Sequence, residues 1–203
     1  MKITKNLLAA LAIATMGMAL QSCSKDDPVP EVDQELITDV TLTFTEVDDA
    51  GMEIGTAMAY KASSAEGIEL STNIDIEVIS GLEADKRYLL EITAYNSIAG
   101  EDITTEILEE GDEHQFYFLG SAFVADSPNM VYAYDDQDED GFPIGLKGYV
   151  TTQPTLVGNA SQFRLILRHD LDKAYAGAEN PSWENFVQAG GETDLDITFP
   201  VTF

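Results

Sequence analysis

The chain has 203 residues, of which 37 are Asp or Glu and 10 are Lys or Arg, so its formal charge at neutral pH is −27. A field of this sign repels phosphate backbones and anionic lipid headgroups, which argues against nucleic acid or a membrane surface as direct partners. The acidic residues are scattered among apolar ones, and 44% of the residues are hydrophobic, which indicates a folded chain rather than a disordered acidic tail.

The first 22 residues have the pattern of a secretory signal peptide. Lys2 and Lys5 form its positively charged start, and residues 7–20 form its apolar region. These fourteen residues are too few for a comfortable membrane-spanning helix, which needs about 20. The sequence LQSC that ends at Cys23 then resembles the bacterial lipobox, in which the Cys becomes the lipidated first residue of the mature chain.

Cys23 is the only cysteine of the chain. The mature protein therefore offers no disulfide framework, no cysteine nucleophile and no thiolate metal site. An ordinary signal peptide with a chance cysteine is the alternative, but a cysteine at the cleavage point is better explained as a lipid attachment site.

Residues 23–34 are predicted to be a tether between lipid and domain. The stretch Ser24, Lys25, Asp26, Asp27 resembles the acidic export tag of Bacteroidota lipoproteins that are sent to the outer face of the outer membrane, although it could also simply solvate the tether. Pro28 and Pro30 favour an extended chain. Residues 24–34, eleven in number, span roughly 35 Å at about 3.3 Å each. We therefore expect a lipid-anchored protein that faces the cell exterior.

The remaining residues, 35–203, read as one β-rich domain. Val40, Leu42 and Phe44 alternate with threonines, which is the pattern of a half-buried strand. A turn signal at 48–51 separates this strand from a second one that begins near Ile54 and includes Met58 and Tyr60. Further alternation follows within residues 68–78, and the first two strands together predict a hairpin.

The stretch at 79–96 is the most informative about the fold. A Gly-Leu pair, a polar turn and then Tyr88 at the start of an alternating run resemble the E–F corner of fibronectin type III domains. In that corner a tyrosine hydroxyl bonds back to the backbone of the turn. An ordinary hairpin with a strand-favouring Tyr is the alternative. Both interpretations favour an all-β, antiparallel, immunoglobulin-like or fibronectin III-like sandwich.

Later segments extend this pattern. Residues 102–110 could form a short helix or a strand, and a helix is favoured. A second helix is indicated by Asn180 as cap, Pro181 at its first position and Gly190 as its stop. Further strands are expected at 115–119, 130–134, 146–152, 162–168 and 194–203. Pro200 in the last strand suits an edge position. Because no linker precedes residue 126, we expect one enlarged sandwich rather than two modules.

An acidic turn is the first candidate for a metal site. Asp136, Asp138 and Asp140 alternate and are followed by Gly141, which is how EF-type calcium loops begin. The twelfth position is Lys147 instead of a bidentate Glu, so a solvated, metal-free turn is the alternative. If a cofactor is bound here, it is calcium.

The two histidines are the second candidate. His114 and His169 could hold zinc together with a carboxylate, which is a three-ligand set typical of catalytic zinc. Nothing in their spacing places them together. Each is expected at a strand end, where a hydrogen-bonded histidine is common, so structural roles are favoured over a metal site. There is no G-x-S-x-G nucleophile motif.

Aromatic residues could form a binding face. Phe116, Tyr117 and Phe118 are consecutive, so at least one ring must point away from the core of a two-sided strand. Trp183 and Tyr132 lie in or near loops and are the residues a carbohydrate-binding module would use.

Four stretches resemble a family of small Bacteroidota lipoproteins. They are EDITTEILEEGDEHQFYF (101–118), PIGL (143–146), LRHDLDKA (167–174) and AGGETDLDITFPVTF (189–203). Relatives often carry the label "type 1 periplasmic binding fold", which this sequence does not support because that fold needs long βαβ alternation. The resemblance implies a companion of TonB-dependent outer-membrane transporters and identifies no catalytic residue.

The sequence therefore predicts a non-enzymatic lipoprotein of the outer-membrane surface that assists or captures ligand for a TonB-dependent transporter. Two alternatives stay open: a divalent-metal protein or hydrolase that uses His114 and His169, and a carbohydrate-binding module.

Overall fold

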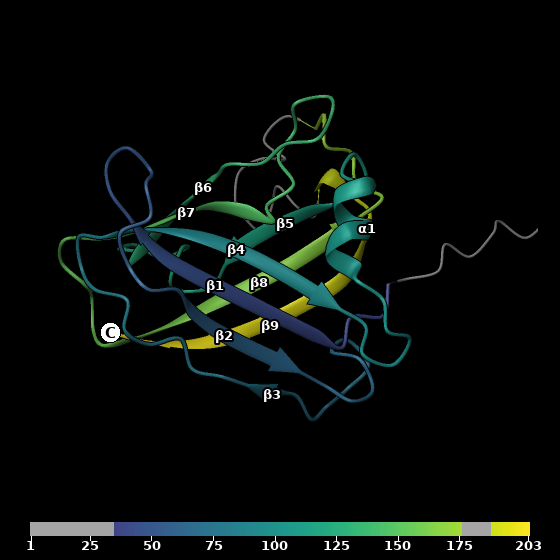
Figure 1. Ribbon diagram of the computed structural model, residues 1–203, viewed down its shortest axis with the longest axis horizontal. Helices are drawn as coiled ribbons and strands as arrows, with labels where there is room; N and C mark the ends of the chain where they lie inside the picture. The colour runs from purple at the N-terminus through teal and green to yellow at the C-terminus, as the bar shows by residue number, and fades with distance from the viewer. Residues whose placement is uncertain (1–34, 176–187) are drawn as a thin grey trace, which may run out of the picture. The chain divides into compact units, whose positions relative to one another are not determined.

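The computed structural model describes residues 35–175 and 188–203 (Figure 1). The predicted signal peptide, Cys23, the tether and residues 180–187 of the predicted second helix, with Trp183, lie outside these residues. In chain order the elements are β1 (Asp39–Val47), β2 (Met58–Ser63), β3 (Asp75–Ile76), β4 (Arg87–Tyr95), α1 (Ile103–Glu109), β5 (Gln115–Leu119), β6 (Met130–Tyr134), β7 (Lys147–Thr152), β8 (Ala160–His169) and β9 (Glu192–Thr202).

The strands form two antiparallel sheets that pack as a sandwich, which confirms the predicted fold class. One sheet has six strands in the order β3-β2-β1-β4-β7-β6, and the other has three in the order β5-β8-β9. In Figure 1 the three-stranded sheet lies behind β1 and β4. Because β6 and β7 complete the sheet that β1 begins, the part of the chain after residue 126 is interleaved with the first part.

The core lies between the sheets and consists of the inward side chains of both. Val40, Leu42 and Phe44 of β1 are fully buried, as their alternation with threonine predicts. Opposite them, Phe163 of β8 makes edge-to-face contact with Phe44 at a ring-centroid distance of 6.2 Å. The alternating residues of β9 complete this layer: Leu195, Ile197, Phe199 and Val201. Pro200 points outward from β9, which lies at the edge of its sheet.

Two of the expected strands are shorter in the structure. The second strand begins at Met58, and Ile54 is 60% exposed in the preceding loop. Of the alternating stretch 68–78, only Asp75–Ile76 pairs with a neighbour. The Ser71 hydroxyl accepts a hydrogen bond from the Asn73 amide, and this local turn competes with strand pairing. In the stretch 68–74, period-two alternation therefore overestimated the strand length, because a short polar side chain satisfies the backbone there.

Tyr88 makes the hydrogen bond expected of a tyrosine corner. Its side chain is buried, and its hydroxyl accepts a hydrogen bond of 2.9 Å from the Glu83 backbone amide. The bond ties the turn before β4 to the strand itself.

Replacing Tyr88 by Phe should lower the free energy of unfolding by about 1–2 kcal/mol, because the Glu83 amide loses its partner. Urea denaturation of the full chain measures this. Tyr95→Phe is the matched control, since Tyr95 is 41% exposed on the same strand. Equal stability of the two variants would contradict a stabilising corner.

The three consecutive aromatic residues are all buried, and one of their rings points away from the sandwich core, as expected. Phe116 and Phe118 face the sandwich core, and Tyr117 points to the opposite side of the sheet, as alternation requires. There Leu171 and Ala189 cover it together with Tyr175. The segment after β8 therefore packs against the outer face of the three-stranded sheet.

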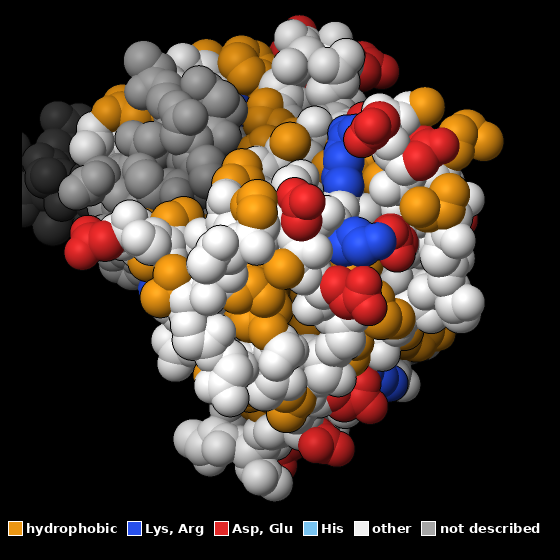
Figure 2. All heavy atoms as spheres, turned by 90° about the vertical axis from the view of Figure 1, so that its left-hand side faces the viewer, with side chains coloured by type: hydrophobic (Ala, Val, Ile, Leu, Met, Phe, Trp, Pro, Cys, Tyr) orange, Lys and Arg blue, Asp and Glu red, His pale blue; other side chains and the backbone are white. Residues whose placement is uncertain are grey.

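Figure 2 shows one face of the molecule, on which Asp and Glu side chains lie among hydrophobic and uncharged groups, several of them beside Lys or Arg. No helix within the described ranges has the length and apolar character needed to cross a membrane.

Candidate functional site

The pairing register of two strands brings the histidines together. Gln115 of β5 lies opposite Arg168 of β8, so the next residue outward on β5, His114, meets His169. Their rings stack with centroids 4.7 Å apart and planes inclined by 10°. His114 is fully buried and His169 is 6% exposed. The spacing alone did not place the two histidines together, and the structure brings them into contact. The structural roles favoured from the sequence stay a prediction.

A bulge in β9 adds a carboxylate to this pair. Leu195 lies opposite Leu167 and Thr193 lies opposite Arg168, which leaves Asp194 as the extra residue of a register shift. Asp194 Oδ2 lies 3.9 Å from His114 Nε2 and 3.9 Å from His169 Nδ1. Strict alternation would place the Asp194 side chain on the outer face of the sheet. The bulge turns it toward the two histidines instead.

A second carboxylate reaches the cluster from the chain before β1. Glu35 Oε1 lies 3.0 Å from His114 Nε2, and the Glu35 side chain is 7% exposed. On the other edge of the same ring, His114 Nδ1 lies 3.0 Å from the Glu110 carbonyl oxygen, just past the end of α1. We call the four residues Glu35, His114, His169 and Asp194 the His–acid cluster.

The His–acid cluster has an excess of hydrogen-bond acceptors. A carbonyl can only accept, so the proton of a neutral His114 lies on Nδ1 and its Nε2 lone pair faces the Glu35 carboxylate. Among the described residues, neither oxygen of the buried Asp194 meets a hydrogen-bond donor. Buried acceptors that face one another are stabilised by a proton, a water molecule or a metal ion between them.

The ionisation of the cluster reflects this excess. Burial raises the pKa of Asp194 to about 6, and the nearby negative charge of Glu35 acts in the same direction. Burial alone would lower the pKa of His114, but the hydrogen bond and charge of Glu35 outweigh it and the pKa is raised. Both shifts favour positive charge within the cluster.

Lys173 holds the loop that carries His114. Its buried ammonium group donates to the carbonyl oxygens of Gly111, at 2.6 Å, and of His114, at 3.1 Å. It also lies 2.7 Å from Asp138 Oδ2, in an ion pair whose side chains are both 3% exposed. Burial opposes the ionisation of Asp138, but the hydrogen bond from Lys173 outweighs it and lowers the pKa of Asp138.

The acidic turn uses its carboxylates on protein groups. Asp138 contacts the Lys173 ammonium group, and Asp136 accepts hydrogen bonds from the backbone amides of Gly145 and Lys147. In the described part of the chain, three or more potential metal ligands lie within 4.8 Å of one another at a few places, and Asp136, Asp138 and Asp140 belong to none of these groups. Calcium at this turn stays a prediction, without a matching ligand group in the structure.

His169 also has an outward edge. Its Nε2 lies 3.5 Å from Glu113 Oε2 and 3.8 Å from Asp170 Oδ1. These two carboxylate side chains are about half exposed, at 50% and 48%. Asp170 has a positive φ of 54°, which turns the chain directly after β8 and keeps its carboxylate beside the imidazole. His169 therefore lies between surface carboxylates and the buried Asp194.

The ligand atoms of the cluster fit a transition metal after a small contraction. His114, His169 and Asp194 are one of the groups whose ligand atoms lie within 4.8 Å of one another. Tetrahedral zinc with bonds of about 2.0–2.1 Å places its ligand atoms about 3.3 Å apart, against 3.9 Å for each histidine nitrogen to Asp194 here. The histidine rings are nearly parallel, so one of them must rotate for both lone pairs to meet on one ion.

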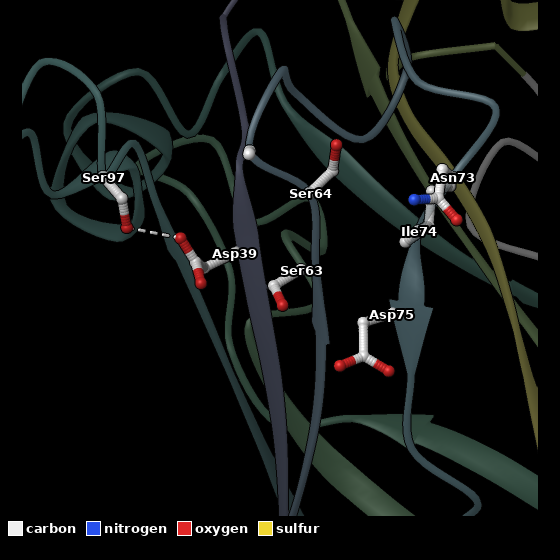
Figure 3. A pocket seen from close by; sticks show the side chains of 8 residues that line it. Asp39, Ser63, Ser64, Asn73, Ile74, Asp75 and Ser97 are labelled. Carbon is white, nitrogen blue, oxygen red and sulfur yellow. Dashed lines mark hydrogen bonds between the residues drawn. The ribbon is translucent and has the colours of Figure 1, made fainter.

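A polar pocket lies at one end of the six-stranded sheet, beside the start of β1 and the end of β2 (Figure 3). Figure 3 shows Asp39 and Ser97 pointing toward each other, with Ser63 and Asp75 nearby. Asp39 accepts a hydrogen bond from Ser97 and pairs with Lys61 at 2.6 Å. The carboxylate of Asp39 is thus already engaged by Ser97 and Lys61, unlike the carboxylate of Asp194 in the His–acid cluster.

Tyr132 does not offer a platform for a sugar ring. It is 8% exposed and stacks on Phe118 with ring centroids 3.5 Å apart, so one face of its ring is covered.

Comparisons with known proteins found no matching family model, no matching curated protein and no matching solved structure.

Proposed function

We propose that the protein is a non-enzymatic, lipid-anchored metal-binding protein of the bacterial cell surface, and that the His–acid cluster holds a divalent transition-metal ion such as Zn²⁺. The observation that carries this proposal is the buried Asp194, which faces two stacked histidines and meets no hydrogen-bond donor among the described residues. An ion at this point supplies the missing positive charge.

The donor set selects the class of metal. Imidazole nitrogens suit Zn²⁺, Cu²⁺, Ni²⁺ and iron, whereas Ca²⁺ and Mg²⁺ prefer oxygen ligands. Two histidines and one carboxylate give two nitrogens and one oxygen, and Glu35 is close enough to supply a fourth ligand. The Glu110 carbonyl holds His114 from its other nitrogen, which is the arrangement that orients ligating histidines in metal sites.

The burial of the cluster supports binding rather than hydrolysis. A catalytic zinc keeps an open coordination position that substrate and water can reach. Here His114 is fully buried, and Asp194 and His169 are 2% and 6% exposed. A substrate of any size would have to displace the loops that carry these ligands.

Purified full-length protein, extracted in mild detergent, should bind about one Zn²⁺ per chain with a Kd of roughly 1 µM or lower, equivalent to about −8 kcal/mol. Excess Mg²⁺ in the buffer suppresses weak association with surface carboxylates. Elemental analysis and competition with a fluorescent zinc indicator measure stoichiometry and affinity. The double variant His114→Gln/His169→Gln should lose the site and keep its far-UV circular dichroism. Equal binding by both proteins would overturn the proposal.

The anchor and the partner are a separate part of the proposal. They rest on the sequence around Cys23 and on the resemblance to companions of TonB-dependent transporters. A lipid anchor with a short tether keeps the domain at a high local concentration near a membrane partner, so a weak interface suffices. Basic extracellular loops or a metal-bound cargo would complement the acidic surface.

A mild-detergent pull-down of the tagged protein from native outer membranes tests this part. We expect a stoichiometric TonB-dependent transporter, and a Cys23→Ala variant should lose both membrane attachment and the transporter. Recovery of the lipoprotein alone would overturn the accessory role while leaving the metal site to its own test.

A further inference from the structure

His169 separates two groups of metal ligands that lie one behind the other. On its inner edge, Nδ1 faces Asp194 at 3.9 Å, and His114 stacks against the ring. On its outer edge, Nε2 faces Glu113 and Asp170 at 3.5 and 3.8 Å. The ligand atoms of the outer group also lie within 4.8 Å of one another. One imidazole is thus shared between a solvent-facing group and a buried group.

We propose that Glu113, Asp170 and the Nε2 atom of His169 form an outer capture site, from which a divalent transition-metal ion passes to the buried group of His114, His169 and Asp194. This inference rests on the proposed function and assigns the route by which the ion reaches the cluster.

The exposure of the residues supports this order. Glu113 and Asp170 are about half exposed, whereas Asp194 is buried. A hydrated divalent ion that moves directly into a buried site would lose its water shell in one step, which is costly. Exposed carboxylates first replace part of that shell. Their negative charge also raises the local concentration of cations next to His169.

The stacking of the rings supports the same route. Because their planes are inclined by only 10°, the two imidazoles cannot both direct an in-plane lone pair at one ion in the present arrangement. The outer group needs no such convergence, since it uses a single imidazole with two carboxylates on half-exposed side chains. The outer group therefore accepts an ion as it stands, and the inner group accepts it after one ring rotates.

The two carboxylates of the outer group have a matched pair nearby for comparison. Asp112 and Glu192 are also exposed. Asp112 directly precedes Glu113 of the outer group, and Glu192 directly precedes Thr193 at the bulge. Neither belongs to a group of potential metal ligands among the described residues. Neutralising them changes the charge of the region by the same amount without touching His169 Nε2.

Stopped-flow mixing of full-length protein with Zn²⁺, followed by the decay of a weak and fast fluorescent zinc indicator, tests the route. The variant Glu113→Gln/Asp170→Asn should bind Zn²⁺ about tenfold more slowly than the wild type, in line with the rate gains that carboxylate-lined approaches provide. Its Kd should change by much less than this factor, because the ion leaves by the same route. The control Asp112→Asn/Glu192→Gln should stay within about twofold of the wild-type rate.

Three results would overturn the capture site. One is an unchanged rate in the Glu113/Asp170 variant, and another is an equal slowing in the control, which would mean that only the overall charge matters. The third is a loss of affinity as large as the loss of rate, which would make the two carboxylates ligands of the resident ion. Failure of the proposed function itself is distinguishable, because the wild-type protein would then bind no Zn²⁺ at all.

Discussion

Replacing Asp194 by Asn is expected to weaken Zn²⁺ binding by roughly 100- to 1,000-fold. Structural zinc sites bind with about 10–16 kcal/mol shared among four ligands, so one ligand accounts for about 2.5–4 kcal/mol, and each 1.4 kcal/mol is a factor of ten. Asn keeps the shape of the side chain and removes its charge. Competition titration with a fluorescent zinc indicator measures the loss.

The same substitution should leave the metal-free protein at least as stable as the wild type. In the metal-free protein Asp194 is a buried carboxylate without a hydrogen-bond donor among the described residues, and such a charge costs folding free energy. Urea denaturation in the presence of a chelator measures this. A variant that unfolds more easily without metal would show that Asp194 serves the fold and would remove the argument for a metal ligand.

Asp196→Asn is the matched control for both measurements. Asp196 lies two residues further along β9 and pairs with Arg164 at 2.5 Å, with side chains 34% and 30% exposed. An exposed pair of this kind contributes about 0.2–1 kcal/mol. The control should therefore bind Zn²⁺ as the wild type does, so any loss of binding in Asp194→Asn belongs to the cluster and not to the strand.

Replacing Lys173 by Met should lower the free energy of unfolding by about 3–5 kcal/mol. The substitution leaves the Asp138 carboxylate buried without its cation and removes the donor to the carbonyl oxygens of Gly111 and His114. Removing one member of a buried ion pair costs this much because the remaining charge has no compensation. Urea denaturation of the full chain, without added metal, gives the value.

Two further variants test the prediction for Lys173→Met. Lys61→Met breaks the pair with Asp39, in which the Lys61 side chain is 51% exposed, and should cost only about 0.2–1 kcal/mol. The double variant Lys173→Met/Asp138→Asn should recover part of the lost stability, because it removes the uncompensated carboxylate. A Lys173→Met effect no larger than that of Lys61→Met would show that other contacts hold the loop of His114.

Local patterns in the sequence were sufficient for most of the sandwich. The strands at 115–119 and 130–134 have the predicted bounds, and the weakly favoured helix at 102–110 is present as Ile103–Glu109. These elements depend on alternation, turn residues and caps, which act within a few residues of one another. The same rules failed at 68–74, where polar side chains form turns that compete with pairing.

The sequence by itself also determined the residue types of the site, since it contains only two histidines and no cysteine in residues 24–203. Only the tertiary structure decided that they meet. His114 and His169 are 55 positions apart, and their contact depends on the register between β5 and β8, which the sequence of neither strand specifies alone. Asp194 depends on a bulge, and Glu35 on the path of the chain before β1. Residue chemistry is local, whereas the register, the bulge and the packing that bring these residues together result from contacts between distant segments.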